Sequence, residues 1–318
     1  MRTAARLTLR LYRFELAAIL VYGLLLAALG ALVAFRLNSA YPGTECMSLW
    51  QGAPAVAGCE STVDFLDINE GEAGKVMAAM WLLPVVAGVL AGSVLVSREI
   101  EHRTTQFAWS VGTSRRRWFL DRVIPVMLVA VGAVVLAAVT ADVLEGARVP
   151  WLSARASGQD YGLRGPVVVA LALMAFGVSV LVGSLVGRML PALILAAALV
   201  VGIRAVISGA VPFGEPVTVL QDSWSSIVTS DNPLYTGSAW QSADGRVLSF
   251  DEANALAPTG PGQGDPGMWL SEHGTFVALG VRGPDVWRVE LRESGVLVPI
   301  GLVGLVLAGF VVNRRRPY

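Results

Sequence analysis

The chain alternates between long apolar runs and short charged segments, and this pattern organises the whole sequence. Six apolar runs are each about 20 residues long, which is the length that a helix needs to cross roughly 30 Å of hydrocarbon. They lie approximately at residues 15–35, 76–96, 123–142, 167–186, 192–211 and 295–312. We therefore predict an all-α membrane protein with six transmembrane helices.

Composition places the chain in the same class. Hydrophobic residues make up 54% of the sequence and charged residues 15%, whereas soluble domains contain about 25% charged residues. The mean hydropathy is +0.62. The first apolar run follows several arginines, but it is longer than the core of a cleavable signal peptide, so we expect a retained span.

Basic residues are distributed unevenly between the two sides that six spans define. With the N-terminus in the cytoplasm, the inner segments hold 14 basic and four acidic residues, and the outer segments hold nine basic and 20 acidic residues. Cytoplasmic segments of membrane proteins are enriched in lysine and arginine. The pattern predicts a multi-pass plasma-membrane protein with both termini in the cytoplasm.

The N-terminal arginines recur at positions 2, 6, 10 and 13, which places them on one stripe of a helix. Because this stripe is joined directly to the first span, it favours lipid phosphates over nucleic acid as its partner. We expect an N-terminal interfacial helix on the inner membrane surface.

The segment 212–294, between the fifth and sixth spans, is the longest outer segment. A turn pattern at 244–245, a capping-box pattern at 249–252 and the alternating stretches GTFVALGV and VWRVEL predict short helices and strands. We expect a small extracellular α+β cap whose aromatic residues form its own core rather than a ligand platform. The division is thus residues 1–211 for spans one to five, 212–294 for the cap, and 295–318 for the sixth span and a basic tail.

The only two cysteines, Cys46 and Cys59, fall in the first outer segment. An oxidising environment there favours a disulfide between them, and two unpaired cysteines are the alternative. The only two histidines, His102 and His273, lie on opposite sides in this topology. A metal site is therefore not expected.

Charged residues are nearly absent from the predicted spans. Arg204 is the one charge well inside a span, and it either contacts substrate or extends toward the outer headgroups, with Asp142 as a candidate partner. The sequence has no Walker A motif, no H-E-x-x-H motif and no serine–histidine–aspartate order. The chain is not expected to be an enzyme, and energy for any transport must come from another polypeptide.

The stretch SREIEHRTTQFAWSVGTSRRRW, residues 97–118, is unusually charged for a connection between two spans. Apolar residues at 100, 107, 108 and 111, with Thr104 between them, share one helical face. We expect an amphipathic helix near 98–111 along the inner membrane surface. Thr113 or Ser114 would then cap the third span, and the arginines at 115–117 with Trp118 would anchor that span at the headgroup level.

This stretch resembles the cytoplasmic coupling-helix region of ABC-2 type permeases, the membrane subunits of one class of ABC exporters. The shared pattern is an acidic-basic pair directly after the second span, a threonine-bearing helix, a small-residue turn and TSRRRWFLDR. The likeness is greatest to actinobacterial members, although Arg103 stands where many members have glycine. The six spans, the basic N-terminal helix, the large outer segment and the arginine-rich C-terminus also resemble this family.

The resemblance implies that the chain is the permease subunit of an ATP-driven exporter. A separate cytosolic ABC ATPase, in two copies per complex, would bind the coupling helix and carry the ATP and magnesium that this chain lacks. The chain would pair with a second copy of itself or with a related permease. The residues that the motif assigns to ATPase contact are Glu99, Glu101, His102, Arg103, Thr104 and Thr105.

Other interpretations of the same features remain open. The charges at 98–105 could serve only topology and lipid phosphates, but paired glutamates gain nothing at an anionic surface. The chain could also be a membrane sensor or scaffold whose cap binds a ligand and signals to a cytosolic partner without transport. For the exporter, the absence of a charged pore lining favours an amphipathic or hydrophobic substrate such as a drug, a lipid or a peptide-like molecule.

Overall fold

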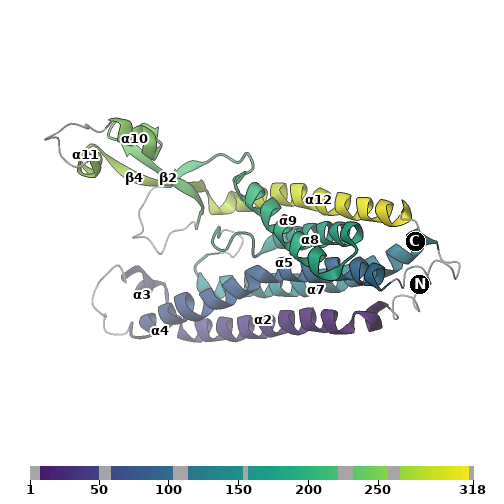
Figure 1. The fold of residues 1–318 in the computed structure, drawn as a ribbon. Coiled ribbons are helices and arrows are strands. Elements are labelled where there is room, and N and C mark those ends of the chain that lie inside the picture. Colours follow the sequence, from purple (N-terminus) through teal and green to yellow (C-terminus); the bar gives the residue numbers. More distant parts are fainter. Residues whose placement is uncertain are drawn as a thin grey trace.

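The computed structural model describes residues 8–49, 59–102, 114–152, 157–220, 232–256 and 266–314. Within these residues, six helices are long and apolar enough to cross a membrane, as the hydrophobic pattern predicts. They are α2 (Arg13–Ala40), α5 (Gly74–Glu101), α7 (Arg115–Arg148), α8 (Gly165–Val186), α9 (Met189–Ser208) and α12 (Val286–Arg314). Figure 1 shows them as an elongated bundle in which α2 begins and α12 ends at the same end.

This end of the bundle is called the terminal end, and the opposite one the sheet end. At the sheet end, α3 (Thr44–Leu49) and α4 (Ser61–Asp67) lie close to the last turns of α2 (Figure 1). The helix α4 runs without a break through a π-helical segment, η1 (Ile68–Ala73), into α5. The second span therefore extends well past the apolar run that predicts it.

The helix α8 lies at the centre of the bundle and is the most enclosed of the six long helices. One group of buried side chains joins α2, α5 and α7, and a second joins α8, α9 and α12. Both groups draw on α5 and α8, so these two helices connect the halves of the bundle. The outer faces of α2, α9 and α12 carry exposed leucine, valine and phenylalanine, as expected for lipid-facing surfaces.

Glycines allow α8 to approach its neighbours closely. A Cβ added at Gly92 of α5 would lie 2.6 Å from the carbonyl oxygen of Phe176, and one at Gly183 would lie 2.7 Å from that of Ser93. Without a hydrophobic driving force between helices in lipid, such backbone-to-backbone packing is a main source of helix association. Gly92 in the second span and Gly183 in the fourth thus serve packing inside the chain. Gly187 ends α8 in a left-handed conformation with φ 67°.

A four-stranded antiparallel sheet lies between α9 and α12 in the sequence. Its strands are β1 (Thr218–Leu220), β2 (Leu234–Ser242), β3 (Val247–Leu248) and β4 (Gly274–Val281), in the spatial order β1-β4-β2-β3. Two short helices, α10 (Phe250–Leu256) and α11 (Pro266–His273), pack on it, and Trp240 is buried between the sheet and Leu270. Ser249 and Glu252 form the capping box that the sequence predicts at the start of α10.

The stretch VWRVEL is helical, which corrects the prediction of a strand there. After a short 3-10 turn, η3 (Gly283–Asp285), α12 begins at Val286, nine residues before the predicted start of the span. The buried residues Val286, Val289 and Glu293 recur at spacings of three and four, so the helical period decides the fold of this stretch. Glu293 consequently lies inside a long helix rather than in a loop.

Candidate functional site

The charged stretch at 97–118 begins inside α5, is described as far as His102, and is described again from Ser114 into α7. The predicted helix near 98–111 stays a prediction, because residues 103–113, with Arg103, Thr104 and Thr105, lie outside the described residues. Glu101 and His102 are exposed at the terminal end. Of the residues predicted to contact an ATPase, these two are described by the structure and face solvent.

Glu99 lies inside the chain instead of on an exposed polar face. Its side chain accepts a hydrogen bond at 2.9 Å from the hydroxyl of Tyr12 and pairs with the guanidinium of Arg122. The residue is only 8% exposed. A carboxylate held in this way positions the end of α5 and does not present itself to a separate subunit.

Tyr12 attaches the segment before α2 to the end of α5. Its hydroxyl oxygen also lies 2.8 Å from the carbonyl oxygen of Leu95, so the one hydroxyl proton is shared between this oxygen and the Glu99 carboxylate. The residue is 4% exposed. Burial, and then the neighbouring Glu99 carboxylate, raise the pKa of Tyr12 far above its usual value, so the hydroxyl remains a donor. An ion pair at 2.9 Å between Arg98 of α5 and Glu15 of α2 joins these two helices directly.

The first turns of α7 also contact the end of α5. Ser114 caps α7, its side chain accepting from the backbone N–H of Arg117, as the sequence predicts for this position. The Arg122 guanidinium lies 4.6 Å from the ring centre of Trp118. Trp118 is 4% exposed, so its ring packs inside the protein, against Arg122, and is not on the surface.

We call Tyr12, Glu15, Arg98, Glu99 and Arg122 the terminal-end cluster. It joins α2, α5 and α7 at the point where the chain leaves α5. Glu101 adds a fourth helix, because its carboxylate accepts from the backbone N–H of Met189 at 2.8 Å in the first turn of α9. A displacement of the segment after Glu101 would therefore act on four helices together.

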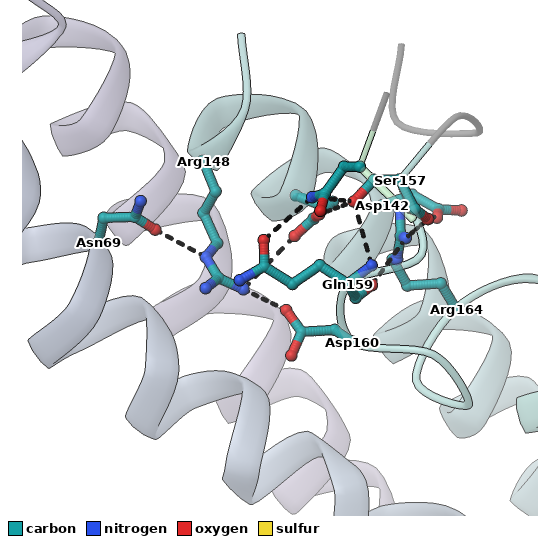
Figure 2. A network of polar contacts seen from close by, with 9 residues as sticks. Asn69, Asp142, Arg148, Ser157, Gln159, Asp160 and Arg164 are labelled. Atoms are coloured by element: carbon teal, nitrogen blue, oxygen red, sulfur yellow. Dashed lines mark hydrogen bonds and ion pairs between the residues drawn. The ribbon is translucent and has the colours of Figure 1, made fainter. Parts of the chain in front are cut away.

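A second polar network lies at the sheet end, around Arg148 at the last turn of α7. Figure 2 shows its guanidinium between Asn69 of η1 and Asp160 of the α7–α8 connection. Glu145, one turn earlier, is fully buried and accepts from the hydroxyl of Ser157 at 2.6 Å. Arg164 donates to the carbonyl oxygen of Ser157 at 2.6 Å, so the part of this connection from Ser157 to Arg164 is held together by its own contacts.

Arg204 is partnered by Glu293 of α12, and not by Asp142. Asp142 lies 4.0 Å from Arg164 instead. The Glu293 carboxylate is fully buried and also accepts from the hydroxyl of Tyr161, whose pKa is raised by burial and then by this hydrogen bond. The correction follows from the earlier start of α12, which brings Glu293 opposite α9.

Sequence reasoning missed most of these sheet-end residues. Glu145 and Arg148 stand at the end of an apolar run and look like ordinary flanking charges. The available signal is their spacing of three residues on a helix that continues past the run, which allows both to face the same side. Their partners come from two other segments, η1 and the α7–α8 connection, and no pattern in the chain indicates that meeting.

The described residues contain no group of three or more histidine, cysteine, aspartate or glutamate side chains that could hold a metal ion. Cys46 and Cys59 are joined in a disulfide with a Cα–Cα distance of 5.5 Å, next to the sheet end of α2. The polar groups of both clusters are mostly paired with one another. Such an arrangement is suited to holding helices in a defined relation.

Comparison with known proteins gives one match. The model of the family described as "ABC-2 membrane transporter related" matches residues 16–211, which is more than half of the chain and covers the first five long helices apart from the first three residues of α2. Comparisons with curated proteins and with solved structures gave no match. The chain therefore belongs to the ABC-2 membrane transporter related family and is a multi-pass membrane protein of the ABC-2 permease type.

Proposed function

We propose that this chain is the membrane-spanning half of an ATP-driven exporter, with its terminal end in the cytoplasm. A separate ABC ATPase would supply the energy, and two ATPase copies would serve a pair of permeases. The uneven distribution of arginines supports this orientation, which places the sheet and the disulfide outside the cell. The residues proposed to meet the ATPase are Glu101 and His102, together with Arg103, Thr104 and Thr105.

The observation that carries this proposal is the attachment of α5 at the terminal end. The segment that would receive force from an ATPase starts directly after Glu101, and the preceding turn is joined to α2, α7 and α9. Buried, charge-assisted hydrogen bonds are stronger than exposed ones and keep a fixed geometry. A push on this segment would therefore be transmitted to the bundle rather than absorbed locally.

The transported molecule is proposed to be amphipathic or hydrophobic. In the described residues, the charged side chains gather at the two ends of the bundle, and the intervening faces of the long helices are apolar. A strongly charged substrate would find no compensating groups there. Outward transport is the direction that the family resemblance favours.

The test is co-purification from native membranes. We expect the wild-type chain to retain a polypeptide with a Walker A motif, and Glu101→Arg to lose it while still inserting into the membrane. Glu70→Arg is the matched control, because it makes the same charge change on an exposed residue at the sheet end. Retention of the ATPase by the Glu101 variant would contradict the assignment, and a partner without nucleotide-binding motifs would favour the sensor alternative.

A further inference from the structure

A cleft of about 530 Å³ lies at the sheet end, between the last turns of α2 and the helix α4. Its walls are Arg36, Ser39 and Ala40 on one side, and Ser61, Asp64 and Ile68 on the other. None of these residues takes part in the terminal-end cluster or in the network around Arg148. The cleft is thus a separate feature of the molecule. An inference about its ligand requires only that the chain spans a membrane.

The position of this cleft along the bundle matches the headgroup layer of a bilayer. The lipid-facing run of α2 ends with Phe35, which is 70% exposed, and Arg36 is the first charged residue after Glu15. Arg36 pairs with Glu72, which lies just before the apolar run of α5 that begins after Lys75. The hydrocarbon boundary on this side of the bundle therefore falls next to Arg36, with the cleft immediately beyond it.

The two walls carry charges of opposite sign. The Arg36 side chain lines the cleft, is 48% exposed, and uses its Nη1 as the donor to Glu72. A guanidinium has five N–H donors in all, so it can pair with a phosphate as well. Asp64 is exposed on the other wall and forms no ion pair with the described residues. Phosphate is a preferred partner of an arginine fork, and an ammonium group is a natural partner of an aspartate.

The surrounding charge distinguishes between possible headgroups. Glu60, Asp67, Glu70 and Glu72 belong to the same stretch as Asp64, and Lys75 is its one basic residue. A headgroup with a net negative charge would be repelled by this acidic stretch, whereas a phosphate that carries its own ammonium would be attracted at both ends. Leu32 and Phe35 offer an exposed apolar surface for acyl chains directly below.

We propose that this cleft binds the headgroup of a zwitterionic phospholipid, with the phosphodiester at Arg36 and a primary ammonium group at Asp64. The lipid would bridge α2 and α4 from the bilayer side. A soluble phosphodiester with an ammonium group shares this chemistry, and the position at the hydrocarbon boundary favours the lipid. The proposal does not depend on an ATPase or on transport.

The experiment measures lipid binding to the delipidated full-length protein by native mass spectrometry and by thermal shift in detergent. The probes are phosphatidylethanolamine, phosphatidylglycerol and soluble glycerophosphoethanolamine. We expect saturable binding of phosphatidylethanolamine that Asp64→Asn weakens by about tenfold, as loss of one charge-assisted contact predicts. Asp67→Asn, the same change on an exposed residue of α4 outside the cleft, is expected to bind as the wild type does.

Arg36→Gln is a second variant with the same expected loss. Because it also breaks the pair with Glu72, its folding is checked by size-exclusion chromatography, and Asp64→Asn carries the test alone if Arg36→Gln aggregates. Equal binding of phosphatidylglycerol, or unchanged phosphatidylethanolamine binding by Asp64→Asn, would overturn the proposal. Equal protection by glycerophosphoethanolamine and by the lipid would overturn the assignment to a membrane lipid.

Discussion

Gly177 of α8 and Gly301 of α12 face each other so closely that a Cβ on Gly177 would overlap the carbonyl oxygen of Gly301. The contact is equally close from the other helix, because a Cβ on Gly301 would lie 2.6 Å from the carbonyl oxygen of Leu173 in α8. No side chain separates the two backbones at this point. The central helix and the last helix therefore pack through their main chains.

Replacing Gly177 by alanine should destabilise the bundle. The methyl group has no flexible neighbour to displace, and overpacking of this kind costs about 1–3 kcal/mol or more. Thermal unfolding in detergent should show a lower midpoint. Gly202→Ala is the matched control on α9, where nothing lies within 4 Å of the added Cβ, and it should leave the midpoint unchanged or slightly raised.

The Arg204–Glu293 pair predicts a large and non-additive effect of mutation. Glu293→Ala leaves a nearly buried guanidinium without its partner, which costs about 3–5 kcal/mol of folding free energy. The double variant Arg204→Met, Glu293→Ala should recover much of this loss in thermal unfolding. The exposed pair Arg288–Asp285 is the control, and its disruption should cost under about 1 kcal/mol. Equal losses for both pairs would show that burial of Glu293 has no energetic consequence.

The disulfide predicts both a stability change and a location. Cys46 and Cys59 are 13 residues apart, and closing a loop of this length stabilises a protein by about 3 kcal/mol. Replacing both by serine should lower the thermal midpoint. In intact cells, a membrane-impermeant maleimide should label the chain only after treatment with an impermeant reductant; labelling that requires permeabilised cells would reverse the proposed orientation.

The capping box of α10 should depend on pH. Hydrogen bonds from the backbone N–H and hydroxyl of Ser249 lower the pKa of Glu252 below its usual value near 4.5. The carboxylate therefore contributes stability to α10 above pH 4.5, and this contribution is lost as the pH falls through the lowered pKa. Amide hydrogen exchange in α10, corrected for intrinsic rates, should show this loss in the wild type and no such dependence in Glu252→Gln. Glu272→Gln, on α11, should behave as the wild type.

Several features followed from local patterns because their physical cause is local. Each long helix needs about 20 apolar residues in lipid, so hydropathy alone revealed the six spans. The capping box at Ser249 and the cap at Ser114 depend on residues three positions apart. The same local character explains why the strand GTFVALGV was predicted correctly as β4.

Features that depend on contacts between distant segments could not be obtained in this way. Alternation in VWRVEL resembles a strand until the buried surface of α12 is known, and Glu293 then changes from a loop residue to the partner of Arg204. Glu99 looks like an exposed charge of a surface helix, yet Tyr12, just before α2, and Arg122 of α7 enclose it. A partner that is 87 residues away leaves no trace in local periodicity.

The sequence by itself determined the class of protein, the number of spans and the location of the charged connection, because the bilayer imposes those properties on each segment separately. Only the tertiary structure decided which charges are paired, how α5 is joined to α2, α7 and α9, and where Arg36 and Asp64 face each other across a cleft. The reason is physical. Burial in lipid acts on single helices, whereas ion pairs and close glycine contacts exist only after the helices have been brought together.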